Sequence, residues 1–341
     1  MKIAVWGCGA IGGVAGAGMA AAGEDVLLVD IVPEHINAIN ERGLLVKFGN
    51  GEQRVPARAA LPAQVAGTFD VVFLAVKSQY RDAAIEMILP HLTPQSAVVS
   101  LQNGVNEPHI ARRIGVDRTI GCLVDVSSDY QGPGEIMRGR AGNFFVGELD
   151  DRITPRLEEI RRLLGLSVPA FTRGNIMGCV WAKICKGTVD ATTALVDTDA
   201  LKLRADQAYH PVRIQLLREG IMAAAADGVR VEAFAHFDPA PFLDPSPAGV
   251  AKAFEVLDEM ARGQAHNNTR VRTGYWRDIV VRKRKTELEY VTGEIVRTGA
   301  RHDVPTPLNA LQMNMFDEIE SGRREMKWEN LAELNAALGK L

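Results

Sequence analysis

The 341-residue sequence is short of cysteine, of aromatic residues and of net charge, and each shortage excludes a class of protein. Its four cysteines form no Cys-x-x-Cys pair, which argues against a disulfide framework or a zinc site and favours a reducing, cytoplasmic location. A net charge of −3 offers no basic excess for nucleic acid or an anionic membrane. With 6% aromatic residues, the chain also has few stacking platforms for single-stranded nucleic acid. The remaining composition, 47% hydrophobic and 24% charged, is that of a folded protein.

An apolar segment long enough to cross a membrane is also missing. The one candidate is the run that starts after Lys2 and ends at Ala22. Residues 7–23 include seven glycines, and glycine is a poor helix former. The segment fits a strand, a turn and a helix better, and we therefore expect no membrane association.

Apolar strands alternate with helical segments in the first half of the chain, which predicts an α/β fold with a mostly parallel sheet covered on both faces. The second half is helical almost throughout, apart from an irregular proline-rich connection at residues 236–249. We expect a dinucleotide-binding α/β domain at residues 1–167 and an all-helical substrate and catalytic domain at residues 175–341. The expected strands are 2–6, 25–29, 69–76 and 97–101, with a hairpin at 44–60; the expected long helical stretches are 175–197, 205–228, 276–299 and 307–338.

Three glycines follow the first expected strand with the spacing Gly-x-Gly-x-x-Gly. Alone the pattern is common, but here it lies between a strand and a helix in a βαβ unit, which is typical of a dinucleotide-binding loop. The first glycine allows a tight turn, the second lets the backbone approach a pyrophosphate, and the third lets the helix pack on the strand. The start of the helix then faces the negative charge of the phosphates. The expected cofactor-binding residues are Gly7, Gly9, Ala10, Ile11 and Gly12.

Asp30 ends the second expected strand, 18 residues after Gly12. A carboxylate at this place accepts hydrogen bonds from the adenosine ribose hydroxyls and repels a 2′-phosphate. Its neighbours Ile31 and Val32 supply no cation that could neutralise such a phosphate. The sequence therefore predicts NAD in preference to NADP, although a cap for the following helix is a compatible role for Asp30.

Three polar residues stand where chemistry would be expected. Lys77 and Asn103 each follow an apolar strand at its carboxyl end, where open α/β sheets bind ligands. Lys183 lies in the first helix of the second domain among apolar neighbours, and a partly buried lysine can exchange a proton near neutral pH. On the residues alone, a solvated strand end, an Asn-Gly turn and a structural helix residue are equal alternatives.

Six motifs in this order resemble the ketopantoate reductase (2-dehydropantoate 2-reductase) family over essentially the whole chain: Gly7-x-Gly9-x-x-Gly12, Ala75-Val-Lys77, Gln102-Asn103-Gly104, Trp181-x-Lys183, Arg277-Asp278 and Thr286-Glu287. The resemblance implies a Rossmann-type, doubly wound N-terminal domain, a helical C-terminal domain and nicotinamide-dependent reduction of a 2-keto acid. It also implies that Lys183 donates the proton to the carbonyl oxygen and that Asn103 holds nicotinamide and substrate. Lys77 would then lie at the cofactor, and Glu287 would reach into the same site.

The sequence departs from the family at the substrate. Gly187 and Ala191 stand where the family usually carries asparagines, and the family's serine before Arg277 is missing. Arg272 and Arg277 are instead the candidates for the substrate carboxylate, because a guanidinium fork matches it. Thr273 is a further candidate substrate-binding residue, since it, Thr188 or Asp190 could replace the missing contacts. The interval between Asp278 and Glu287 is also one residue longer than usual.

Three functions remain open from the sequence. The first is NAD(P)H-dependent reduction of a 2-keto acid with a lysine as proton donor. The second is NAD-dependent oxidation of another branched or bulky 2-hydroxy acid, or of a secondary alcohol. The third is a non-catalytic NAD-binding sensor. The expected partner is a small 2-keto or 2-hydroxy acid, with no metal, nucleic acid or membrane, and a homodimer is left open.

Overall fold

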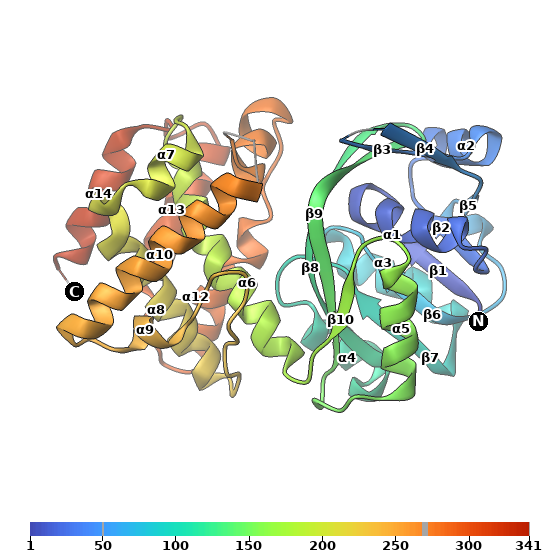
Figure 1. Cartoon of the computed structure of the whole chain (residues 1–341), viewed down its shortest axis with the longest axis horizontal. Helices are drawn as coiled ribbons and strands as arrows, with labels where there is room; N and C mark the ends of the chain where they lie inside the picture. The colour runs from blue at the N-terminus through green and yellow to red at the C-terminus, as the bar shows by residue number, and fades with distance from the viewer. Residues whose placement is uncertain (50, 268–271, 341) are drawn as a thin grey trace. The chain divides into compact units, whose positions relative to one another are not determined.

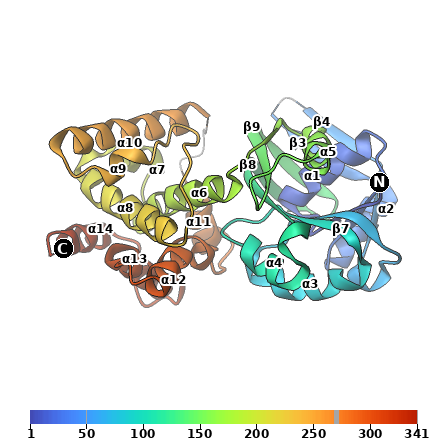
Figure 2. The same cartoon turned by 90° about the horizontal axis from the view of Figure 1, so that it is seen from below.

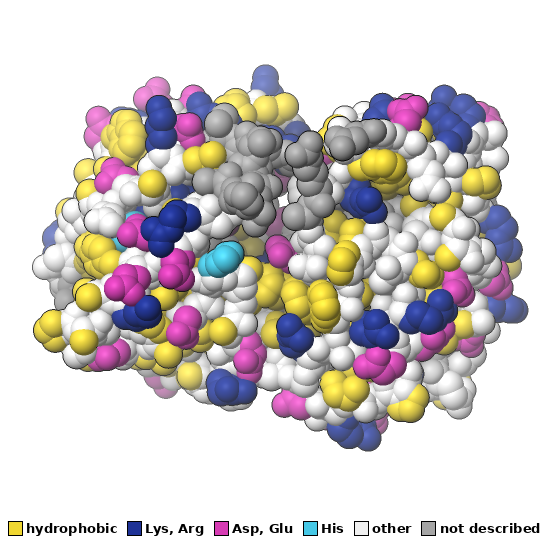
Figure 3. Space-filling model, viewed as in Figure 1, with side chains coloured by type: hydrophobic (Ala, Val, Ile, Leu, Met, Phe, Trp, Pro, Cys, Tyr) yellow, Lys and Arg dark blue, Asp and Glu magenta, His cyan; other side chains and the backbone are white. Residues whose placement is uncertain are grey.

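The chain forms two compact units, Met1–Ile176 and Met177–Leu341 (Figure 1). The computed structural model describes residues 1–49, 51–267 and 272–340. On the face shown in Figure 3, basic and acidic side chains are interspersed rather than gathered by sign.

The first unit is built on a ten-stranded sheet with the order β4-β3-β9-β8-β7-β6-β1-β2-β5, and β10 pairs with β9. All pairs are parallel except β3–β4 and β8–β9, which confirms the expected mostly parallel sheet. The strands are β1 Ile3–Trp6, β2 Val26–Val29, β3 Leu44–Phe48, β4 Gly51–Val55, β5 Arg58–Ala60, β6 Phe69–Leu74, β7 Leu92–Ser100, β8 Thr119–Gly132, β9 Glu135–Glu148 and β10 Ala170–Thr172.

Helices cover both faces of this sheet, as a doubly wound fold requires (Figure 2). Along β1, Ile3 and Val5 pack in one apolar core with α1 and α5, whereas Ala4 and Trp6 pack in a second core with α3 and α4. Continuous apolar strands are therefore stable here, because both of their faces are buried. The helices of this unit are α1 Ala10–Ala21, α2 Pro33–Arg42, α3 Arg81–Ile88, α4 Glu107–Ile114 and α5 Pro155–Gly165.

The long antiparallel pair β8–β9 was not expected from the sequence. The first half of β8 is buried, but most of its residues from Asp125 onward are partly or fully exposed, so the strand lacks a sustained apolar pattern. The expected hairpin at 44–60 forms between β3 and β4 only, since β5 pairs in parallel with β2.

Every element described in the second unit is helical, as expected. None of the helices in the described ranges is long and apolar enough to cross a membrane. The α-helices are α6 Ile176–Ala191, α7 Ala200–Ala205, α8 His210–Ala226, α9 Ala240–Leu243, α10 Pro247–Asn267, α11 Gly274–Trp276, α12 Thr292–Arg301, α13 Pro307–Glu320 and α14 Trp328–Leu338.

The expected helix over 276–299 is wrong. A π-helix spans Arg277–Val281, the chain is then irregular up to a 3₁₀ turn at Leu288–Tyr290, and α12 begins only at Thr292. The carboxylate of Asp278 accepts hydrogen bonds from Arg282 (2.7 Å) and Arg284 (2.8 Å), which holds residues 282–284 against the π-helix. The stretch 307–338 is likewise two helices, separated by residues that include Gly322 at φ +74°.

Candidate functional site

The turn after β1 requires glycine at its first position. Gly7 has φ +92°, and a Cβ there would lie 2.7 Å from the backbone nitrogen of Val76. The backbone nitrogens of Gly7 and Cys8 donate hydrogen bonds to the carbonyl oxygen of Val29, at 2.8 and 3.1 Å. These bonds hold the loop on the carboxyl ends of β1 and β2, where the sequence placed it.

The other two glycines of the motif have different surroundings. A Cβ on Gly12 would collide with the carbonyl oxygen of Gly7 and lie 3.0 Å from Ala75 Cβ, so α1 packs on the sheet only without that side chain. A Cβ on Gly9 would meet no described atom within 4 Å. Gly9 is the N-cap of α1, and the first turn of α1 holds no acidic residue.

This start of α1 is therefore suited to a phosphate. The first backbone N–H groups of a helix, those of Gly9, Ala10, Ile11 and Gly12 here, have no acceptor within the helix. Together with the helix dipole they favour an anion, and the side-chain-free face at Gly9 lets one approach the backbone. The residues present fit the pyrophosphate of a dinucleotide.

Two acidic residues, Asp30 and Glu34, lie just after β2. Asp30 follows the strand, is partly exposed, and accepts a hydrogen bond from the backbone nitrogen of Val32 at 3.2 Å. The pKa of Tyr130 on β8 is raised by partial burial and by the charges of Asp30, Cys8 and Glu34. Burial, and then Asp30, likewise raises the pKa of the Cys8 thiol. Tyr130 was missed in the sequence because β8 itself was missed.

The structure brings the loops of Lys77 and Asn103 together. Lys77 directly precedes Ser78, whose hydroxyl donates to the carbonyl oxygen of Asn103 at 2.6 Å. The side chain of Asn106 donates to the same carbonyl at 2.8 Å and to Ser78 Oγ at 3.0 Å. These bonds join the loops after β6 and β7, and Gln102 adds a bond to the carbonyl oxygen of Val76 at 2.8 Å.

A buried carboxyl group lies behind this pair of loops. Glu107, at the start of α4, is 1% exposed and accepts a hydrogen bond from the backbone nitrogen of Asn106 at 3.0 Å. Burial raises the pKa of Glu107 to about 7, and the hydrogen bond from the backbone nitrogen of Asn106 only partly offsets that rise. Glu107 was not predicted from the sequence, although it lies only three positions after the Gln102-Asn103-Gly104 motif.

In the second unit, α6 carries Lys183 and Gly187 one turn apart on the same face. Lys183 is partly buried between the fully buried side chains of Ala182 and Ile184. Gly187 is covered: a Cβ there would lie 2.7 Å from Val291 Cγ1 and 3.6 Å from the hydroxyl oxygen of Tyr275.

Position 191, two turns after Lys183, lies in the interior of the second unit. Ala191 is 0% exposed and belongs to the apolar core of the unit. The nearby polar side chains of α6 are engaged within the unit: Thr188 bonds Asn309 at 2.7 Å and Asp190 binds Arg204 at 3.0 Å. The two positions that the resemblance assigned to the substrate are thus filled by the protein itself or buried.

The three candidate substrate-binding residues, Arg272, Thr273 and Arg277, differ in their surroundings. The guanidinium group of Arg272 binds Asp197 at 2.9 Å, donates to the carbonyl oxygen of Thr198, and lies 4.9 Å from the ring centre of Trp276. Thr273 is the N-cap of α11 and accepts a hydrogen bond from the backbone nitrogen of Trp276 at 3.4 Å. Arg277 opens the π-helix. The side chains of Arg272 and Thr273 thus already bond to other groups of the second unit.

Glu287 lies on the N-terminal side of the 3₁₀ turn rather than on a long helix. Burial raises the pKa of Tyr275, and so do the charges of Asp190, Glu287 and Asp278. The structure therefore gathers Tyr275, Glu287 and Gly187 around one part of α6, which local sequence spacing alone could not show.

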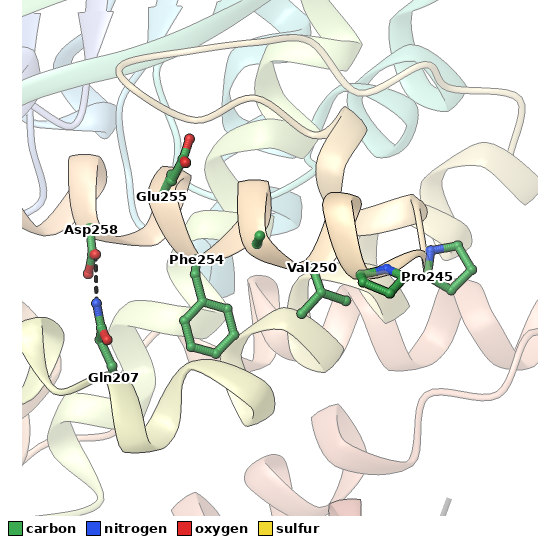
Figure 4. Close-up of a pocket in the computed structure, with 8 residues that line it drawn as sticks. Gln207, Pro245, Val250, Phe254, Glu255 and Asp258 are labelled. Carbon is green, nitrogen blue, oxygen red and sulfur yellow. Dashed lines mark hydrogen bonds between the residues drawn. The ribbon is translucent and has the colours of Figure 1, made fainter.

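The second unit also has a shallow depression of about 730 Å³, which is lined by residues other than those around Lys183 and Gly187 (Figure 4). A hydrogen bond of 2.8 Å joins Gln207 to Asp258 at one end of it. Its lining includes no residue that the sequence analysis selected: Gln207, Pro245, Pro247, Val250, Ala251, Phe254, Glu255 and Asp258. Among the described residues, no cluster of three or more His, Cys, Asp or Glu side chains could hold a metal ion.

Comparison with known proteins finds relatives along the chain. The curated 2-dehydropantoate 2-reductase of Pyrococcus abyssi is 27% identical over 325 residues, covering 94% of this chain and 98% of the relative. That of Lactococcus lactis subsp. lactis is 23% identical and covers 90% of this chain and 94% of the relative.

Solved structures share the fold. A PanE/ApbA family ketopantoate reductase from Ralstonia eutropha JMP134 has a TM-score of 0.77 at 25% identity, covering 95% of this chain and 100% of that chain. A D-mandelate dehydrogenase solved with NADH and anilino(oxo)acetate has a TM-score of 0.79 at 22% identity, covering 95% and 99%.

Two family models together match most of the chain. Residues 3–151 match the model described as ketopantoate reductase PanE/ApbA, and residues 175–320 match its C-terminal model. With the glycine loop and the doubly wound sheet already in place, these matches settle the family. The chain belongs to the ketopantoate reductase family of nicotinamide-dependent oxidoreductases, which act on a keto or hydroxyl group.

Proposed function

We propose that the protein interconverts a 2-keto acid and the corresponding 2-hydroxy acid with NAD(H) as the preferred cofactor. The observation that carries the proposal is the loop at the start of α1. Gly7 and Gly12 have no room for a side chain, whereas Gly9 leaves the helix N-terminus open to a pyrophosphate. The dinucleotide, when bound, supplies or accepts the hydride of the reaction.

The preference for NAD rests on Asp30. A 2′-phosphate beside this carboxylate would meet negative charge, and Glu34 adds to the charge that acts on neighbouring Tyr130. Ribose hydroxyls, by contrast, can donate hydrogen bonds to Asp30. The expected preference is roughly tenfold or more, and each tenfold step corresponds to about 1.4 kcal/mol.

Within this reaction, Lys183 is proposed to donate the proton to the carbonyl oxygen, or to accept it in the reverse direction. The side chain of Lys183 is partly buried. Lys77 and Asn103 are proposed to hold the cofactor, since their loops are tied together at the carboxyl ends of β6 and β7. Glu287, Arg272, Thr273 and Arg277 are proposed to surround the substrate.

A second candidate substrate is a 2-hydroxy acid other than pantoate. The observation that favours it is the cover of Tyr275 and Val291 over Gly187, together with the burial of Ala191. This stretch offers an aromatic ring and one hydroxyl group where the resemblance implied two amides. Polar substrate groups that lose water without gaining partners are penalised, so ketopantoate itself should be a poor substrate.

The experiment is a turnover assay of the purified protein with NADH and a panel of 2-keto acids that includes ketopantoate and phenyl-substituted compounds. The proposal expects NADH oxidation with at least one of them and formation of the 2-hydroxy acid. Binding of NADH without turnover of any compound would instead favour a non-catalytic NAD-binding sensor, the alternative from another class.

Two further properties belong to this proposal. A cytoplasmic location is supported by the four cysteines, which are all buried as free thiols. A homodimer is the assembly that we would test first, by light scattering of the purified chain.

A further inference from the structure

We propose that His35 is a positioning residue for cofactor binding, because it fixes the peptide between Cys8 and Gly9 in the orientation that a pyrophosphate needs. The inference rests on the proposed function, since it takes the loop at the start of α1 to be the pyrophosphate site. His35 lies on α2, outside the glycine motif, and is 1% exposed.

The two ring nitrogens of His35 bind two backbone groups of opposite kind. Nδ1 lies 2.9 Å from the backbone nitrogen of Gly134, and Nε2 lies 3.0 Å from the carbonyl oxygen of Cys8. A backbone N–H can only donate and a carbonyl oxygen can only accept. His35 must therefore be neutral, with its proton on Nε2 and donated to Cys8.

The bond to Cys8 determines where the next N–H group points. The carbonyl of Cys8 and the N–H of Gly9 belong to one planar trans peptide and point in opposite directions. Holding the carbonyl towards His35 therefore holds the Gly9 N–H away from it. Gly9 is the N-cap of α1 and lies on the side that no described atom covers at the Cβ position.

The neighbouring bonds, from Cys8 N to the Val29 carbonyl and from Gly13 N to the Gly9 carbonyl, would stay in place if the peptide between Cys8 and Gly9 rotated, so they do not fix its orientation. The peptide rotates about ψ of Cys8 and φ of Gly9, and Gly9, at φ −67° and ψ −138°, imposes few steric limits on that rotation. A flipped peptide would turn a carbonyl oxygen, rather than an N–H group, towards the phosphates. Repulsion between that oxygen and the phosphates would weaken cofactor binding.

His35 is itself held from the other side. Gly134 forms the turn between β8 and β9, and its carbonyl oxygen accepts a hydrogen bond from the backbone nitrogen of Leu45 at 2.8 Å. The ring of Tyr130 on β8 meets the imidazole edge to face, with ring centres 5.2 Å apart. The glycine loop is therefore braced against a hairpin of the sheet through one side chain.

The test compares His35→Phe, which keeps a ring but has no nitrogen, with His35→Gln, whose amide offers one acceptor and one donor at about the spacing of the ring nitrogens. The matched control is His91→Leu, which removes another histidine bond to a carbonyl oxygen in the same unit, that of Gly67. His35→Leu removes both nitrogens with less added volume, and serves if the phenylalanine variant does not fold.

Calorimetric titration with NADH and with ADP-ribose gives the readout, beside kcat at saturating NADH and the unfolding midpoint. We expect His35→Phe to raise both dissociation constants about tenfold or more with kcat within about twofold. His35→Gln should recover most of the affinity, and His91→Leu should bind like the wild type. Equal affinities in wild type and His35→Phe would overturn this inference alone. A wild-type protein that does not bind NADH would overturn the proposed function as well.

Discussion

Val291 occupies the space that a side chain at position 187 would need: a Cβ on Gly187 would lie 2.7 Å from Val291 Cγ1. Val291 is 7% exposed and lies just before α12, more than one hundred residues along the chain. A valine methyl cannot swing away as the end of a long side chain could. The face of α6 beyond Lys183 is thus shaped by a contact between distant segments.

We predict that Gly187→Ala destabilises the protein, by up to about 2 kcal/mol. Alanine is the better helix former by roughly 1 kcal/mol, but the overlap with Val291 should cost about 1–3 kcal/mol. In a Val291→Ala background the overlap disappears, so the same Gly187→Ala change should become stabilising. Denaturant unfolding of the four proteins measures this, and an effect of the same sign in both backgrounds would disprove the contact.

Lys183→Ala should lower kcat by ~10²–10⁴-fold, which is the usual worth of a positioned acid or base. The dissociation constant for NADH should change little, because the proposed partner of Lys183 is the substrate oxygen. Lys186→Ala is the control: Lys186 is also on α6 but donates to the carbonyl oxygen of Ala235 at 3.0 Å. If the Lys183→Ala enzyme kept most of its kcat, Lys183 would be a structural residue of α6 and not the proton donor.

Glu107 should make folding stability depend on pH. Its pKa is about 7 in the folded protein against 4.5 for the free group, so the folded state favours the neutral acid. The contribution of Glu107 is fully present below pH 4.5 and is lost as pH rises through 7. The loss is on the order of 3 kcal/mol.

The comparison is between wild type and Glu107→Gln, as the change in unfolding free energy from pH 5 to pH 8. The glutamine variant does not titrate, so it should lose less stability over this interval, whatever its absolute stability. If the unfolding free energies of the two proteins changed equally between pH 5 and pH 8, the Glu107 carboxyl would not be the source of the pH dependence.

Asp30→Ala should narrow the preference for NADH over NADPH without abolishing activity, because the repulsion of a 2′-phosphate is removed while Lys183 is left in place. The measurement is kcat/KM with each cofactor in both proteins. Asp25→Ala serves as a control: Asp25 precedes β2 at its other end and pairs with Arg58. An unchanged ratio in Asp30→Ala would mean that another residue sets the preference.

The features that the sequence predicted are those fixed by short-range steric rules. The spacing of Gly7, Gly9 and Gly12 predicted the turn and the close packing of α1. Side chains at Gly7 and Gly12 would collide with adjacent backbone, and Gly9 leaves the start of the helix open. The apolar strands β1 and β6 were predicted because burial on both faces leaves a continuous apolar run.

The features that escaped prediction depend on distant partners. The bonds of His35 join residues 27 and 99 positions away, and no local pattern marks such a histidine. At the π-helix Arg277–Val281, Asp278 binds Arg282 and Arg284, an arrangement that the expected continuous helix over 276–299 did not include. Likewise, nothing near Gly187 in sequence reveals the cover of Tyr275 and Val291.

The steady-state ratio of kcat/KM for NADH and NADPH, measured with the best 2-keto acid of the panel, tests the central claim most directly. The central claim requires that the chain catalyses the redox reaction. It also requires that Asp30, at the end of β2, binds the adenosine ribose hydroxyls and repels a 2′-phosphate. The account predicts turnover with a ratio of about ten or more in favour of NADH. Equal values, or a preference for NADPH, would contradict it.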